Sequence, residues 1–247
     1  MGLSVFEQAV ERARNGGQTG DVIVAEGYAE KESMRGEKDL EFAVILRPDV
    51  SMRQITGVPY VAAYGLVRAL KETVPDVGIA WPYNISVNGA PFGVMQVSAG
   101  YADGMFVVCG VTFDLERYSE AVALPGHSPE MQSQKIEAAL KKEGLLDSKA
   151  VEPAALAEAI VAAVDAWIDD CKAGRAAAGP LAPILNGYFD QVELLGQEVD
   201  VVYPNGNVAY TARFGGVDVW GRAILTGADG KETVITPEQA SIRASQA

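Results

Sequence analysis

Between residues 77 and 113 the apolar positions follow the patterns of β-strands. Four apolar or alternating runs stand here, over 77–80, 85–87, 91–98 and 105–113. The last run is almost continuously apolar, which is typical of a strand buried on both faces. Asn88-Gly89 separates two of the runs, and both residues tolerate the positive φ angles of a type I′ turn. The pattern predicts consecutive strands joined by a hairpin at Asn88-Gly89 and interrupted by a Trp81-Pro82 corner.

Apolar residues recur at helical spacing elsewhere in the first 190 residues. Ser4 stands three residues before Glu7, which is the spacing of a capping box at the start of a helix. Further helices are predicted over 57–74, 153–171 and 181–189, and further strands over 21–25 and 41–47. Together these segments predict an α+β fold, in which a mixed sheet carries helices on one face.

After residue 193 the pattern changes to short alternating strands. Turn residues separate them at 204–207 and at Asp229-Gly230. About fifty residues of this kind are typical of a small SH3-like barrel. The sequence therefore predicts two units, a larger one over 1–190 and an SH3-like one over 191–247.

The composition and charge of the chain argue against several classes of binding partner. The chain has 247 residues and a formal charge of −13, which argues against nucleic acid or an anionic membrane surface as a partner. No apolar stretch reaches the roughly 18 residues of a membrane span and no signal peptide is recognisable, so we expect a cytoplasmic protein. Cys109 and Cys171 stand alone and are interpreted as buried free thiols, so no metal site is expected. His127, the only histidine, is interpreted as an exposed loop residue within the less informative stretch 114–150.

The order of motifs in the strand-rich region resembles the catalytic core of biotin protein ligases, within the biotin/lipoate protein ligase superfamily. That core carries Lys-Trp-Pro-Asn-Asp, then a lysine three residues before a glycine, then Gly-Ile-Asn. The corresponding positions here read Ala80-Trp81-Pro82-Tyr83-Asn84, Ala90-Pro91-Phe92-Gly93 and Gly110-Val111-Thr112. The resemblance implies that Ala80 and Ala90 replace the two lysines and that Thr112 replaces the final asparagine.

The same resemblance implies a ligand groove. It would be shaped by Trp81, Pro82, Asn84, Gly93, Gly110 and Thr112. In the family a Gly-Arg-Gly loop also closes over the acyl-adenylate. Here only Arg35-Gly36 retains that pattern, among acidic residues, so Arg35 is a candidate ligand contact and a solvated polar loop is the alternative. The family's ligand-binding Ser/Thr-Thr-Asn helix start corresponds to about Val5, Phe6 and Glu7, and Ser4 is interpreted as a helix cap.

Three functional hypotheses follow from this resemblance, which also implies ATP, magnesium and biotin as ligands. The first is a relative with a degenerate site that binds a small carboxylic acid, an acyl-adenylate or a carrier domain, with weak or no ligase activity. The second is an active, divergent biotin or lipoate/octanoate ligase whose cation comes from Lys31, Arg35 or Lys38. The third treats the Trp81-Pro82 corner as purely structural. Losing one placed charge costs on the order of 10²–10³ in rate, which favours the first. A homodimer is compatible with all three.

Overall fold

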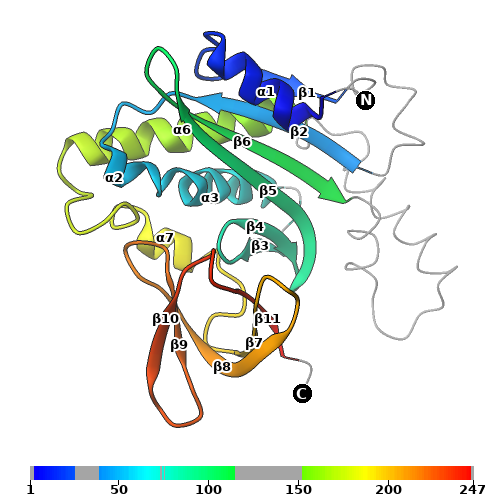
Figure 1. Ribbon diagram of the computed structural model, residues 1–247, viewed down its shortest axis with the longest axis vertical. Helices are drawn as coiled ribbons and strands as arrows, with labels where there is room; N and C mark the ends of the chain where they lie inside the picture. Colours follow the sequence, from blue (N-terminus) through cyan, green and yellow to red (C-terminus); the bar gives the residue numbers. More distant parts are fainter. Residues whose placement is uncertain (1–2, 26–38, 73, 75, 115–151, 246–247) are drawn as a thin grey trace, which may run out of the picture.

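The computed structural model describes residues 3–25, 39–72, 74, 76–114 and 152–245 (Figure 1). Arg35, Lys31, Lys38, His127 and most of the stretch 114–150 lie outside these ranges. Within them, a six-stranded sheet packs with helices in one part of the molecule, and a five-stranded sheet forms another. No helix in the described ranges is long and apolar enough to cross a membrane.

The six-stranded sheet has the strand order β1-β2-β6-β5-β4-β3. Its strands are β1 Val22–Val24, β2 Asp39–Leu46, β3 Val77–Ala80, β4 Asn84–Val87, β5 Ala90–Tyr101 and β6 Met105–Asp114. Every pair of neighbours is antiparallel. The predicted mixed sheet is therefore wrong, because short connections turn β3, β4, β5 and β6 back on one another. In the described part of the chain, parallel pairing is limited to one isolated bridge between Ile79 and Val192.

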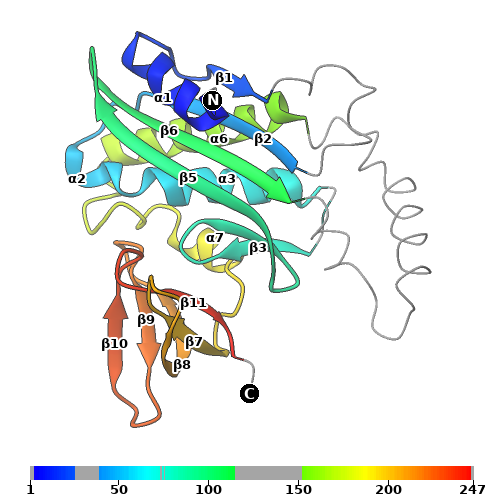
Figure 2. The same cartoon turned by 45° about the vertical axis from the view of Figure 1, so that its right-hand side comes forward.

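Helices cover both faces of this sheet (Figure 2). Phe42, Val44 and Leu46 point into the larger core with helices α3 (Val58–Leu70) and α6 (Pro153–Lys172). Ala43 and Ile45 alternate with them and pack in a smaller cluster with helix α1 (Val5–Arg14). The helices predicted over 57–74 and 153–171 are confirmed, and the helix predicted over 181–189 begins only at Leu185, but the prediction of helices on one face is wrong. The strand buried on both faces is confirmed in β6, whose residues 106–111 are all buried between the two layers.

The hairpin between β4 and β5 has the predicted turn, with φ of 51° at Asn88 and 77° at Gly89. A register shift follows in the ladder, between Ile85 and Ser86. Ala90 pairs with Val87 directly across the turn, and Pro91 pairs with Ser86, whereas Gly93 pairs with Ile85. The bulge therefore changes the pairing of β5 from Gly93 onward.

The C-terminal strands form an antiparallel sheet in the order β10-β9-β8-β7-β11. They are β7 Glu198–Val202, β8 Val208–Val217, β9 Ala223–Thr226, β10 Glu232–Ile235 and β11 Ser241–Ala244. The described residues also form two short helices, α2 (Met52–Ile55) and α7 (Leu185–Phe189). Buried residues of the C-terminal sheet, such as Val199 and Phe214, belong to the same core cluster as Trp81 and Tyr188. The two sheets therefore share one continuous apolar core.

Candidate functional site

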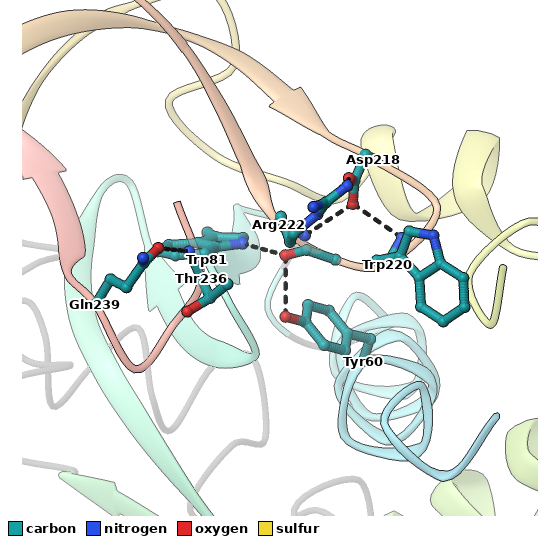
Figure 3. A network of polar contacts seen from close by, with 8 residues as sticks. Tyr60, Trp81, Asp218, Trp220, Arg222, Thr236 and Gln239 are labelled. Carbon is teal, nitrogen blue, oxygen red and sulfur yellow. Dashed lines mark hydrogen bonds and ion pairs between the residues drawn. The ribbon is translucent and has the colours of Figure 1, made fainter. Parts of the chain in front are cut away.

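The Trp81-Pro82 corner lies where the six-stranded sheet meets the C-terminal sheet (Figure 3). Trp81 is 3% exposed, and its Nε1 donates a hydrogen bond of 2.8 Å to the carbonyl oxygen of Gly221. The hydroxyl of Tyr60 donates to the same oxygen at 3.0 Å. The Trp81-Pro82 peptide bond is cis. Trp81 is thus a buried link between the two sheets, with its polar atom engaged inside the protein.

Three tyrosines surround this corner. The ring of Tyr60 lies 5.5 Å from that of Tyr83 and 5.8 Å from that of Tyr188, measured between centroids. The hydroxyl of Tyr188 donates to the carbonyl oxygen of Pro82. Burial raises the pKa of Tyr60 and of Tyr188 well above the ordinary value of a phenol. Both hydroxyls therefore stay protonated and act as hydrogen-bond donors at any physiological pH.

Ala80 and Ala90 point to opposite faces of the sheet. Directly paired residues in an antiparallel ladder share a face. Ala90 pairs with Val87, a residue of the large core, so its side chain lies on the α3 side. Ala80 pairs with Asn84, which alternates with the core residue Ile85, so Ala80 lies on the α1 side. The structure does not bring the two replaced lysine positions together.

The two candidate glycines are separated in the same way. A Cβ at Gly93 would lie 2.7 Å from the ring of Phe113, which belongs to the large core. A Cβ at Gly110 would lie 2.6 Å from the ring of Phe6 in α1. Gly93 therefore faces the α3 side and Gly110 the α1 side. The two glycines that the resemblance assigns to one groove thus lie on opposite faces of the sheet.

The remaining candidates gather on the α1 side of the sheet. Thr112 pairs with Val94, and Gln96 pairs with Gly110, so these side chains share one face. Val94 is 53% exposed, which is unusual for an apolar residue in a central strand. We call this surface the open strip, and it consists of Ala80, Asn84, Val94, Gln96 and Thr112.

Asn84 has a defined role in the open strip. Its Oδ1 accepts a hydrogen bond of 3.0 Å from the backbone N–H of Met95. The β4–β5 ladder ends at Ile85 and Gly93, so the side chain of Asn84 replaces the next backbone acceptor along the ladder. Asn84 thereby fixes the position of the corner relative to β5.

Helix α1 borders the open strip with its first turn. Ser4 and Glu7 form the predicted capping box, with Ser4 Oγ accepting from the N–H of Glu7 and Glu7 accepting from the N–H of Ser4. These bonds lower the pKa of Glu7, the backbone contact most. Sequence reasoning missed the role of Phe6, whose ring packs over Gly110. The signal was present, because the resemblance noted from the sequence implies a small polar residue at about the position of Phe6.

Many of the positively charged side chains in the described ranges contact residues outside the open strip. Arg47, for example, donates to the carbonyl oxygens of Ala13, Gly17 and Ala102. Further contacts of positively charged side chains are Arg12–Asp21, Arg53–Trp220, Arg68–Tyr64, Lys172–Asp49, Arg175–Asp170, Arg213–Gly196, Arg222–Asp218, Lys231–Asp229 and Arg243–Asp200. None of these pairs includes a residue of the open strip.

Two other features lie apart from the open strip. A surface hollow of about 390 Å³ between β1 and α6 is lined by Gly20, Val22, Ala154, Glu158, Val161, Ala162 and Asp165. Cys109 is buried, which raises the pKa of its thiol to about 12. Within the described ranges, no group of three or more His, Cys, Asp or Glu side chains could hold a metal ion. Of the residues singled out from the sequence, the open strip contains Ala80, Asn84 and Thr112.

Residues 1–177 match the sequence profile of the Biotin/lipoate A/B protein ligase family. The chain belongs to this family. No curated protein sequence matches it. Among solved structures, the fold is similar to a biotin protein ligase from Aquifex aeolicus (17% identity, 95% of this chain and 94% of that chain covered, TM-score 0.58). It is also similar to a biotin protein ligase-like protein of unknown function from a Silicibacter species (20% identity, 95% of this chain and 90% of that chain covered, TM-score 0.60). The A. aeolicus ligase in complex with biotin and ATP is a further match (16% identity, 85% of this chain and 80% of that chain covered, TM-score 0.54). At these identities the likeness establishes the fold.

Proposed function

We propose that the protein binds a small carboxylic acid, or the corresponding acyl-adenylate, on the open strip, with weak or no ligase activity. The observation that carries this proposal is the composition of the face that bears Ala80. This face combines an exposed valine with neutral hydrogen-bonding side chains, and Ala80 brings no charge to it. Such a surface suits an apolar acyl chain better than a triphosphate.

The argument against efficient ligation is electrostatic. Acyl-adenylate formation builds negative charge on phosphorus, and preorganised cations usually stabilise it. Ala80 cannot do so, and Ala90 faces the opposite side of the sheet. Phe6 restricts where on this face a ligand could lie, because its ring fills the space over Gly110.

The alternative is an active, divergent ligase that attaches biotin, lipoate or octanoate to a lysine of a carrier domain. The likeness to a ligase that binds biotin and ATP supports it. Its cation would come from Lys31, Arg35 or Lys38, all outside the described residues. The proposal also includes ATP and magnesium as ligands, and a carrier domain or a second copy of the chain as a partner. It further includes an SH3-like fold for residues 191–247 and a cytoplasmic location.

Titration calorimetry with biotin, lipoate and octanoate, each with and without ATP and magnesium, tests the binding site. The variant Val94→Glu places a carboxylate in the middle of the open strip and should abolish acid binding through like-charge repulsion. Val208→Glu is the matched control, because Val208 is 46% exposed in the C-terminal sheet. Equal affinities for the two variants would place the ligand away from the open strip.

A further inference from the structure

The carbonyl oxygen of Gly221 is a shared acceptor at the junction of the two sheets (Figure 3). It receives one hydrogen bond from Tyr60 in α3 and one from Trp81 at the corner. Gly221 has a φ of 79°, and a Cβ there would lie 2.3 Å from the ring of Tyr60. Only glycine fits this conformation and this close approach without strain.

The carboxylate of Asp218 makes three hydrogen bonds within the turn that presents this carbonyl. Oδ1 of Asp218 accepts from the backbone N–H groups of Trp220 and Arg222, at 2.9 and 3.0 Å. Oδ2 accepts from the guanidinium of Arg222 at 2.7 Å. The N–H of Gly221 donates to the carbonyl oxygen of Asp218 at 2.9 Å. Two contacts from outside the sheet also reach this turn: the N–H of Leu181 donates to the carbonyl oxygen of Val219 at 3.0 Å, and the guanidinium of Arg53 lies over the ring of Trp220.

The chain itself connects Trp81 to the open strip. Trp81 follows Ala80 directly and precedes Asn84 by three residues. The side chain of Asn84 in turn accepts a hydrogen bond from the N–H of Met95, beyond the end of the β4–β5 ladder. A displacement of the corner would therefore appear first as exposure of the Met95 amide.

We propose that the turn 218–222 of the C-terminal sheet positions the open strip, with Gly221 as the positioning residue that acts through Trp81 and Asn84. The C-terminal sheet then sets the geometry of a binding surface to which it contributes no side chain. This role is independent of which acid binds, because it concerns the shape of the surface before any ligand arrives.

Native-state hydrogen exchange of the full chain, followed by NMR, tests this link. Trp81→Phe removes the indole donor, and Asp218→Ala loosens the turn from a remote position. One hydrogen bond contributes about 0.5–1.5 kcal/mol net, so the Met95 amide should exchange about two- to tenfold faster than in the parent. That change is measured relative to the slowest amides of β6, which report global unfolding.

Two matched controls separate positioning from loss of stability. Trp167→Phe removes an equally buried indole, whose Nε1 donates to the carbonyl oxygen of Pro180 at 2.7 Å. Asp229→Ala removes another turn carboxylate of the same sheet, which accepts from the N–H of Lys231. Both controls should leave the relative exchange of Met95 unchanged. The proposal fails if the controls accelerate Met95 as much as the test variants, or if neither test variant accelerates it.

Discussion

Ala80→Lys should tighten the binding of an anionic adenylate. The size of this gain in affinity follows from the position of Ala80. Ala80 is half-buried on the α1 side of the sheet, in register with Asn84. A charge-assisted hydrogen bond contributes about 1.5–3 kcal/mol, which corresponds to roughly 10- to 150-fold in affinity. Because the open strip is partly exposed, solvent screens the new ammonium group, and the lower end of about tenfold is expected.

Ala90→Lys is the matched control for this substitution. Both variants change the formal charge of −13 by the same single unit, so any long-range attraction of an anion is equal in the two. Only Ala80 lies on the α1 side, because Ala90 pairs with the core residue Val87. Titration calorimetry with a non-hydrolysable biotinyl-adenylate analogue measures the difference. The double variant should bind no better than Ala80→Lys alone, and equal affinity of the parent and Ala80→Lys would refute the reasoning.

Two further predictions concern stability. Gly65→Ala should destabilise the fold by about 1–2 kcal/mol in urea unfolding, because the added Cβ would lie 2.5 Å from the Cβ of Ala163 and force α3 and α6 apart; an unchanged midpoint would contradict this close packing. Asp21→Asn should flatten the loss of stability in acid. The guanidinium of Arg12, as the largest cause, lowers the pKa of Asp21 in the folded state, so its contribution is present above about pH 4 and is lost as the pH falls through the lowered value. The free energy of unfolding that is lost between pH 7 and pH 3 should be smaller in the variant than in the parent. The difference should be less than about 1 kcal/mol, because the ion pair is exposed.

Local patterns predicted the elements whose causes lie within a few residues. Asn88-Gly89 forms its turn because both residues tolerate positive φ angles, and Ser4 caps its helix because Glu7 stands three residues later. The helices over 57–74 and 153–171 follow from apolar spacing alone. Family membership was predicted from the motifs around Trp81-Pro82.

Features that depend on register and on distant partners could not be predicted in this way. The bulge at Ile85–Ser86 shifts the pairing of β5 from Gly93 onward, and no residue type in that stretch indicates the shift. The position of α1 on the second face depends on packing across the sheet. The bond from Trp81 to Gly221 joins residues 140 positions apart, and such pairs leave no local pattern.

The most direct test combines binding and turnover in one sample. Parent protein is mixed with biotin, lipoate or octanoate and with ATP and magnesium; calorimetry records acid binding, and a coupled assay records pyrophosphate release. We expect saturable binding of at least one acid, with pyrophosphate release at least 10²-fold below that of an active ligase measured alongside, since a placed charge is worth about that factor. Release at the rate of the active ligase would contradict the proposal and establish the divergent enzyme instead.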